Sequence, residues 1–348
     1  MHTDPHAPDP RAIGRAAECL RAGGLVAFPT ETVYGLGANA LDPAAVQRLF
    51  EAKGRPPSNP LIVHARDADA ARALALDWPP AAETLARACW PGPLTLVVLK
   101  RDCIPAVVTA GGPTVALRVP NHPVALALLH AAAVPIAAPS ANRSGEVSPT
   151  RAEHVLASAL ADSVDLLLDA GPAPGGIEST VIDLTVRPAC VLRLGLLSPS
   201  RVSELLGAPV CVARGAGVVS APPAAAPGGS TEPAAAERSP GRMSRHYAPR
   251  ARLEQRADAA LRVGALLAAG RRVGWLTFGV EAAPWPPDVS RLRRIVMPAD
   301  AGAYSARLYA ALHELDGDGV EYIIVDEPPA EDAWLAIRDR LERASRPP

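Results

Sequence analysis

The chain has 348 residues, of which 49% are hydrophobic and only 4% aromatic, and its formal net charge is -1. This length predicts two domains, and the aliphatic composition is typical of an α/β protein and excludes a fibrous or wholly disordered chain. With no run of five or more Lys or Arg, the charge gives no reason to expect tight nonspecific binding to nucleic acid.

Short aliphatic runs that predict strands alternate with Ala-rich helical segments in the first part of the chain. The predicted strands are residues 25–28, 61–64, 94–99, 115–119, 135–138, 166–168, 180–184 and 191–194. Eight strands in one stretch predict a large mixed, twisted sheet with helices packed on it. We therefore expect an α/β first domain over residues 11–207.

A change of composition separates this part from the rest. Residues 220–241 crowd Pro, Ala, Gly and Ser together, so the segment 208–249 reads as a linker that ends in the motif HYAP. Beyond it we expect a helix at 253–269, a strand at 273–278, a helix at 301–315, a strand at 322–326 and a helix at 331–344. This alternation predicts a smaller, Rossmann-like α/β domain over residues 250–345, although no Gly-x-Gly-x-x-Gly opens a helix there.

The five cysteines and the apolar runs indicate in which cellular compartment the protein is expected. The cysteines are odd in number and widely spaced and include no Cys-x-x-Cys pair, which predicts reduced thiols with neither disulfides nor zinc. The first ten residues hold no apolar h-region, and every aliphatic run is shorter than the roughly 18 residues of a membrane span. We expect a cytoplasmic protein without membrane contact.

Two cations stand at the end of a predicted helix. The helix begins after Asp42, Lys53 lies on its apolar face, and Gly54 ends it, so Lys53 and Arg55 leave the same corner. One reading is that the cations complement the helix dipole. The other is that they capture phosphate.

Two arginines lie on predicted strands. Alternation places Thr114 and Arg118 on the face opposite to the apolar residues of their strand, and the same argument covers Arg193. Such arginines are either solvated or present a fixed fork to a carboxylate.

Several polar side chains follow predicted strands. Ser140 and Asn142 sit at a strand end, where open α/β sheets bind ligands, and Ser148 lies just beyond. The alternative is a turn stabilised by local hydrogen bonds, and the glycine-rich segment before Ser179 has the same ambiguity. His64 lies on a predicted buried strand, and its position is equally compatible with a core residue and with a functional one.

No catalytic nucleophile can be argued from the sequence. Glu31 and Asp42 are candidate general bases, but neither has a visible partner, and Asp42 looks like a helix N-cap. Hydroxyls, backbone amides and cations in residues 29–37, 53–56 and 140–145 point instead to a phosphate-bearing ligand held without a Walker-type loop.

Six motifs occur in a fixed order: PTETVYGLG (29–37), KGRP (53–56), NPLIVH (59–64), WPGPLT (90–95), APSANRSG (138–145) and ESTV (178–181). Together they resemble the YrdC-like superfamily. SPG at 239–241 and HYAP at 246–249, followed by an α/β domain, resemble its two-domain branch, the threonylcarbamoyl-AMP synthases.

The resemblance implies a nucleotidyltransferase that makes threonylcarbamoyl-AMP and pyrophosphate from L-threonine, bicarbonate or CO2, and ATP, with Mg2+ accompanying the nucleotide. The product is the activated intermediate for threonylcarbamoyladenosine modification of tRNA. A downstream tRNA threonylcarbamoyl transferase complex is therefore an implied partner.

The resemblance also implies roles for individual residues. Lys53 and Arg55 would hold phosphates as the catalytic cations. The nucleotide would also contact Thr114, Ser140, Asn142, Ser148, Arg193 and Tyr247. Threonine would be held by Thr30, His64, Arg118 and Ser179, with Arg118 on its carboxylate. His246 and Tyr247 would fold over the cleft as a lid, and no protein side chain is assigned to a metal.

Two rival readings belong to other classes of protein. The first is a double-stranded-RNA-binding or ribosome-associated protein without this activity, which the near-zero net charge disfavours, although weak RNA binding is compatible with it. The second is a carbamoyl-transfer module of the kind joined to hydrogenase maturation enzymes, but the chain has no zinc-knuckle cysteines or acylphosphatase-like segment.

Overall fold

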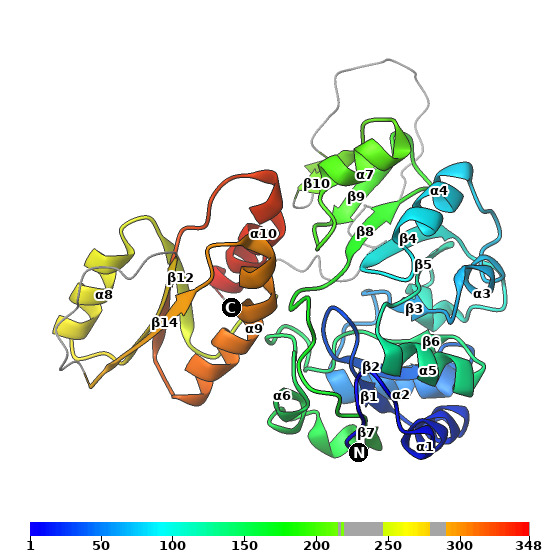
Figure 1. Cartoon of the computed structure of the whole chain (residues 1–348), viewed down its shortest axis with the longest axis horizontal. Coiled ribbons are helices and arrows are strands. Elements are labelled where there is room, and N and C mark those ends of the chain that lie inside the picture. Colours follow the sequence, from blue (N-terminus) through cyan, green and yellow to red (C-terminus); the bar gives the residue numbers. More distant parts are fainter. Residues whose placement is uncertain (215–216, 219–245, 279–289, 348) are drawn as a thin grey trace.

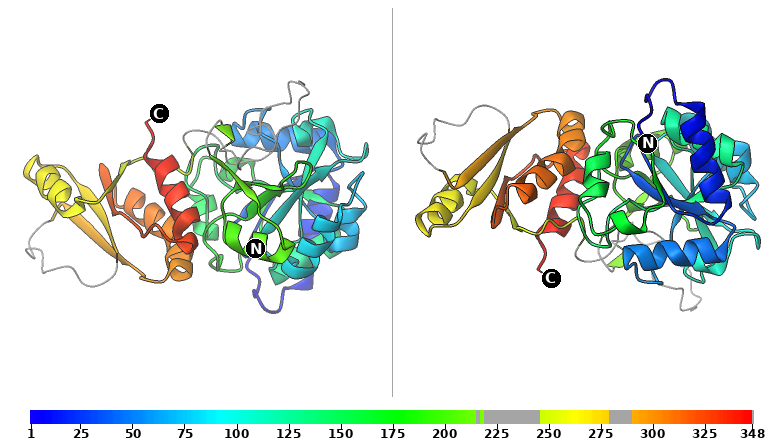
Figure 2. Two further views of the ribbon diagram at one scale, coloured as in Figure 1. Left: turned by 90° about the horizontal axis from the view of Figure 1, so that it is seen from above. Right: turned by 90° about the horizontal axis from the view of Figure 1, so that it is seen from below.

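The computed structural model describes residues 1–214, 217–218, 246–278 and 290–347. Within them the strands form two separate sheets, one of eleven strands and one of four. The two sheets and their helices lie side by side (Figure 1, Figure 2). The predicted linker at 220–241 and the SPG motif lie outside the described residues.

The larger sheet has the order β11-β10-β9-β8-β4-β5-β3-β6-β2-β1-β7. Its strands are β1 (Val26–Phe28), β2 (Gly35–Asn39), β3 (Ile62–His64), β4 (Leu94–Leu99), β5 (Thr114–Arg118), β6 (Ile136–Ala137), β7 (Leu166–Leu167), β8 (Thr180–Asp183), β9 (Cys190–Arg193), β10 (Cys211–Arg214) and β11 (Gly217–Val218). All eight predicted strands are present. The sheet is mixed as predicted, since β5 pairs parallel with β3 and antiparallel with β4.

Helices cover both faces of this sheet. They are α1 (Pro10–Arg21), α2 (Pro43–Lys53), α3 (Ala68–Arg72), α4 (Pro80–Cys89), α5 (Pro123–Ala132), α6 (Ala152–Leu156) and α7 (Pro199–Leu206), with short 3-10 turns η1 (Ala106–Thr109) and η2 (Ala161–Ser163). Residues of α1 and α5 share one core with Val26 and Phe28. Residues of α2 and α4 share another core with Ala27, because neighbouring strand residues point to opposite faces.

Helix α2 begins and ends where the sequence predicts. The carboxylate of Asp42 accepts a hydrogen bond from the backbone N–H of Ala44 at 2.9 Å. At the other end Gly54 adopts a left-handed conformation with φ 57°. Lys53 is buried on the core side of the helix, as the periodicity predicts.

The smaller sheet has the order β12-β15-β13-β14, and its strand pairs are all parallel. Its elements are β12 (Arg252–Arg256), α8 (Ala259–Ala268), β13 (Val273–Phe278), β14 (Leu292–Met297), α9 (Ala301–Gly317), β15 (Tyr322–Asp326), η4 (Asp332–Trp334) and α10 (Leu335–Ser345). A Rossmann half has the order 3-2-1. The observed order differs from it, so the α/β class is confirmed but the Rossmann-like label is not.

The predicted helix at 253–269 is wrong at its beginning. Residues 252–256 form β12, which pairs with β15 over five residues, and the helix begins only at Ala259. Four of the five residues of β12 are polar or charged, so the strand has little sequence signal of its own, and its pairing with β15 decides its conformation.

The two parts of the chain contact each other through α9 and α10, which lie on the side of the smaller sheet that faces the larger one, whereas α8 lies on the far side (Figure 1). Nε2 of His313 on α9 donates to the carbonyl oxygen of Ser148 at 3.1 Å. Its ring also stacks on that of His154 on α6, with centroids 3.9 Å apart.

The prediction of five reduced cysteines is wrong for one pair. Cys190 and Cys211 form a disulfide, with their Cα atoms 4.5 Å apart. The cause is the register of β9 and β10, which run parallel and place the two residues opposite each other. No strand is predicted at residues 211–214, which lie beyond the predicted end of the first domain. The sequence therefore offers no reason to place Cys211 beside Cys190. No helix in the described ranges is both long and apolar enough to cross a bilayer.

Candidate active site

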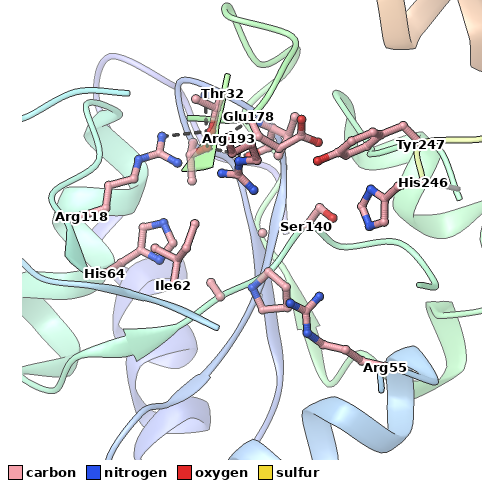
Figure 3. A pocket seen from close by; sticks show the side chains of 15 residues that line it. Thr32, Arg55, Ile62, His64, Arg118, Ser140, Glu178, Arg193, His246 and Tyr247 are labelled. Carbon is pink, nitrogen blue, oxygen red and sulfur yellow. Dashed lines mark hydrogen bonds between the residues drawn. The ribbon is translucent and has the colours of Figure 1, made fainter. Parts of the chain in front are cut away.

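A cavity opens on one face of the larger sheet, beside His246 and Tyr247 of the segment that leads into the smaller sheet (Figure 3). Its lining consists of Thr30, Thr32, Val33, Gly35, Arg55, Ile62, His64, Arg118, Ala138, Pro139, Ser140, Glu178, Arg193, His246 and Tyr247. Figure 3 shows Arg118 and His64 on one side, His246 and Tyr247 on the other, and Arg193 between them. Eight of the predicted site residues therefore meet at one place.

Strand pairing brings Arg118 and His64 together. They are register partners on β5 and β3, and both side chains point to the cavity face of the sheet. Nη2 of Arg118 donates to Oγ1 of Thr32 at 3.0 Å and lies 2.7 Å from Oε1 of Glu31. Glu31 thus has a charged partner, contrary to the expectation from sequence, which had no means of pairing residues 87 positions apart.

The loop after β1 is tied by its own hydroxyls. Oγ1 of Thr30 donates to the carbonyl oxygen of Val33 at 2.7 Å and shares a hydrogen bond with Oγ1 of Thr32 at 2.8 Å. Thr114, by contrast, lies at the opposite end of β5 from Arg118 and does not line the cavity. Its predicted contact with the nucleotide has no support from this placement.

Arg55 is held rigidly at the cavity wall. Its Nε donates to the carbonyl oxygen of Asn59 at 2.9 Å, and its Nη2 donates to Asn59 Oδ1 at 2.6 Å and to the Pro60 carbonyl at 2.7 Å. Burial, together with the nearby charge of Arg193, lowers the pKa of Arg55 to about 9. The side chain therefore stays cationic at neutral pH.

Lys53 lies behind the cavity rather than in its wall. Its Nζ donates to the carbonyl oxygen of Ser140 at 2.6 Å and to that of Asn142. Burial, and then the charge of Arg55, lowers the pKa of Lys53 well below its ordinary value. Lys53 and Arg55 leave one corner, as predicted, but their side chains diverge, and Lys53 holds the loop that presents Ser140.

The same loop carries Asn142, whose Nδ2 donates to the carbonyl oxygens of Arg143 at 2.8 Å and Glu146 at 2.9 Å. Asn142 does not line the cavity. Its contacts are those of a loop-stabilising side chain, which the sequence offered as the alternative reading.

Ser179 supports Arg193 from below. Nε of Arg193 donates to the Ser179 carbonyl and its Nη2 donates to Ser179 Oγ, both at 3.0 Å. Ser179 Oγ also shares a hydrogen bond of 2.8 Å with Oγ1 of Thr95. The carbonyl oxygen and hydroxyl of Ser179 are therefore engaged in hydrogen bonds within the protein, while Arg193 lines the cavity. Burial lowers the pKa of Arg193.

Glu178 is a lining residue for which the sequence predicted no role, although it stands in the ESTV motif. Ser148 Oγ donates to its Oε1 at 2.6 Å, whereas Tyr309 OH at 3.1 Å and Arg340 Nε at 2.8 Å donate to its Oε2. Burial would raise the pKa of Glu178, but the charges of Arg340 and Arg193 outweigh it and lower the pKa. Ser148 contacts Glu178 and does not line the cavity.

His246 and Tyr247 close the cavity from the side of the smaller sheet. Tyr247 has a backbone φ of 60°, its ring stacks on Tyr309 at 5.8 Å, and the Arg340 guanidinium lies 4.8 Å from its centroid. Burial lowers the pKa of His246 to about 3, so its ring is neutral at pH 7. Burial, followed by the charge of Arg118, does the same to His64.

The cavity thus presents three arginines, Arg55, Arg118 and Arg193, beside neutral histidines and hydroxyls. Glu31 pairs with Arg118, whereas no ion pair of 4 Å or less within the described residues neutralises Arg55 or Arg193. The arrangement therefore suits a ligand that brings negative charge of its own. Among the described residues no group of three or more His, Cys, Asp or Glu side chains is placed to hold a metal ion.

Known proteins match nearly the whole chain. A family model with the description "Telomere recombination" (Sua5_yciO_yrdC) matches residues 18–195, and one for "Threonylcarbamoyl-AMP synthase, C-terminal domain" (Sua5_C) matches residues 210–346. The threonylcarbamoyl-AMP synthase of Pyrococcus abyssi is 40% identical over 335 residues, covering 95% of this chain and 93% of its own length. That of Bacillus subtilis is 40% identical over 342 residues, covering 97% and 93%.

The structural comparison agrees. A crystal structure of P. abyssi Sua5 complexed with L-threonine superposes with a TM-score of 0.85 at 37% identity, over 99% of this chain and 97% of that chain. The likeness extends over both sheets, in line with the two family models. The chain belongs to the threonylcarbamoyl-AMP synthase family, in its Sua5-type form with a YrdC domain and a Sua5 C-terminal domain.

Proposed function

We propose that this protein catalyses the synthesis of threonylcarbamoyl-AMP from L-threonine, bicarbonate or CO2, and ATP. The amine of threonine takes up CO2 and loses a proton to form a carbamate. A carbamate oxygen then attacks the α-phosphorus of ATP, the bond from that phosphorus to the bridging oxygen breaks, and pyrophosphate leaves. The chemistry needs positioning and charge compensation rather than a protein nucleophile.

The observation that carries this proposal is the convergence of three buried arginines on one cavity. Arg118, next to the hydroxyls of Thr30 and Thr32, suits the carboxylate of threonine. Arg55 and Arg193 suit the phosphates of ATP, whose charge their buried guanidinium groups would balance. The neutral His64 adds no further positive charge where the amine must be free to react.

Other predicted residues do not line the cavity but position the residues that do. Lys53 and Asn142 shape the loop that presents Ser140 to the nucleotide, and Ser179 fixes Arg193. Ser148 acts through Glu178. Each is a positioning residue in this proposal, whereas Arg55, Arg118 and Arg193 would touch substrate.

Mg2+ would enter with ATP, held mainly by phosphate oxygens and water. It would neutralise charge on the departing pyrophosphate. In the described part of the chain Glu178 is the only carboxylate that lines the cavity, and its oxygens already accept hydrogen bonds from three residues.

The HYAP segment would serve as a lid. With His246 and Tyr247 in place the cavity has a volume of about 50 Å³, against roughly 300–1,000 Å³ for sites that hold small-molecule ligands. The cavity must therefore widen for ATP and threonine to enter. In this proposal His246 and Tyr247 make that movement, and their return would exclude water from the reacting groups.

The proposed organisation is the predicted one, with a catalytic domain over residues 11–207, a linker with the lid over 208–249, and a C-terminal domain over 250–345 that anchors the lid. It needs one amendment, because β10 and β11, within the predicted linker, pair with the larger sheet and so extend the catalytic domain. The product is short-lived in water as a mixed anhydride, so a tRNA threonylcarbamoyl transferase complex is the partner that would use it for tRNA modification.

The experiment supplies ATP, threonine and bicarbonate to the purified full chain and detects the adenylated product by mass spectrometry. Omission of any one substrate should abolish the product. Product formed without threonine, or no product with all three present, would refute the proposal.

A further inference from the structure

We propose that Arg340 of α10 is a positioning residue of the active site: it holds the Glu178 carboxylate from behind and so leaves Arg193 turned into the cavity for the phosphates of ATP. The inference rests on the proposed function and extends it to a side chain of the smaller part of the structure, 162 positions beyond Glu178.

Arg340 is 1% exposed and uses its whole guanidinium within the protein. Nε donates to Glu178 Oε2 at 2.8 Å, Nη1 to Asp339 Oδ2 at 2.7 Å, and Nη2 to the carbonyl oxygen of Leu194 at 2.7 Å. Cζ of the guanidinium also lies over the ring of Tyr247, 4.8 Å from its centroid. In the described part of the chain, no other side chain contacts Glu178, Leu194 and Tyr247 together by hydrogen bonds and ring contact.

Arg193 is the competing partner for Glu178. The charge of each residue stabilises the charged form of the other, lowering the pKa of Glu178 and opposing the fall in the pKa of Arg193. No ion pair of 4 Å or less joins the two side chains, since Glu178 pairs with Arg340. Arg193 instead donates through Nε and Nη2 to Ser179. Within the described ranges no hydrogen bond uses its Nη1, and the side chain lines the cavity.

Loss of Arg340 alone would leave Glu178 as a buried carboxylate without its ion pair, which is strongly unfavourable. Arg193 lines the cavity and is the other arginine whose charge acts on Glu178, so its guanidinium would turn toward Glu178 and away from the ligand. Arg340 also donates a hydrogen bond to the carbonyl of Leu194, the residue that follows Arg193. Loss of this contact would free the backbone next to Arg193 and help its side chain to turn.

The test uses the full chain and compares Arg340→Met, Glu178→Gln and the double variant, with Arg338→Met as the matched control. Arg338 lies on the same helix and contacts Pro328 and Glu327, away from the cavity. ATP affinity is measured by calorimetric titration without bicarbonate, and KM values for ATP and threonine are measured from product formation.

We expect Arg340→Met to weaken ATP binding about tenfold or more while the KM for threonine stays within about twofold. Glu178→Gln removes the charge that would draw Arg193 away, so the double variant should bind ATP within about threefold of Glu178→Gln alone. Arg338→Met should match the wild type. A purely structural role would instead lower kcat with the folded fraction and leave the KM for ATP unchanged.

Equal ATP affinity in Arg340→Met and wild type would overturn the inference, as would a double variant as weak as Arg340→Met. If Arg340→Met does not fold, the double variant is used instead, because it has no charged carboxylate at position 178. A double variant that binds ATP a further tenfold more weakly than Glu178→Gln would refute the inference. An inactive wild type that does not bind ATP would instead refute the proposed function itself.

Discussion

Nη2 of Arg118 lies 2.7 Å from Oε1 of Glu31, so the arginine proposed to bind the carboxylate of threonine already faces a carboxylate of the protein. Both side chains are almost completely buried. The pair fixes the direction of the Arg118 fork before any substrate arrives, which is the preorganisation that binding of an amino acid requires.

Arg118→Lys tests this assignment. Lysine keeps the charge but loses the fork, so we expect the KM for threonine to rise roughly 10- to 100-fold, which corresponds to about 1.4–2.7 kcal/mol. ATP affinity should stay within about twofold. Arg66→Lys is the matched control, because Arg66 is an exposed arginine that pairs with Asp67 at 3.1 Å. An unchanged threonine KM would remove Arg118 from the threonine site.

The two cations at the end of α2 should respond differently to substitution. Arg55→Ala should abolish threonine- and bicarbonate-dependent pyrophosphate release by the folded protein, because Arg55 lines the cavity. It should also lower the free energy of unfolding, because the acceptors on Asn59 and Pro60 lose their donor. Unaltered turnover in this variant would show that Arg55 does not serve the reaction.

Lys53→Met should lower the free energy of unfolding by about 1–3 kcal/mol, because the buried carbonyls of Ser140 and Asn142 lose their donor. It should also weaken ATP binding through the displaced loop. Urea denaturation measures the first effect. Lys100→Met is the control, since Lys100 is the chain's only other lysine and donates to a single carbonyl far from the site. A stable Lys53→Met protein with normal activity would contradict the loop-holding role.

The stacked rings of His154 and His313 predict acid sensitivity of the contact between the two parts of the chain. Burial, and then the neighbouring His313, lowers the pKa of His154 from an ordinary 6.5 to about 3. Its contribution to stability is therefore complete above pH 6.5 and is lost as the pH falls from there toward 3.

His154→Phe keeps a stacking ring but cannot bind a proton. The urea midpoint of the wild type should fall more steeply between pH 7.5 and 5 than that of His154→Phe. His130→Phe, at an exposed position on α5, should retain the slope of the wild type. Parallel pH profiles for wild type and His154→Phe would show that this ring does not titrate with folding.

Tyr247→Ala tests the lid. The substitution removes the stacking on Tyr309 and the contact with Arg340, so closure should weaken. Water should then reach the α-phosphorus of ATP and the mixed anhydride, and its attack on either releases AMP. We expect a fall in kcat of about tenfold or more and a higher ratio of AMP to threonylcarbamoyl-AMP among the products. Wild-type turnover and product ratio in Tyr247→Ala would contradict a lid function.

Local pattern was enough to predict much of this fold and part of the site. Aliphatic runs located the eight strands, helical periodicity placed Lys53 on a buried face, and strand alternation placed Arg118 opposite the apolar core. These signals work because they depend on neighbours within one element.

The remaining features depend on pairings between distant segments. Glu31 with Arg118, Glu178 with Arg340 and Cys190 with Cys211 are each set by strand register or by the docking of α10. Strand β12 was predicted as helix for the same reason, because a charged edge strand is defined by its partner.

The most direct test of the central claim is a crystal structure with threonine and a non-hydrolysable ATP analogue bound together. The account predicts the threonine carboxylate within about 3.2 Å of the Arg118 guanidinium and the triphosphate against Arg55 and Arg193, with no bond from either ligand to the protein. Both ligands bound elsewhere with this cavity empty, or a covalent link to a side chain, would contradict it.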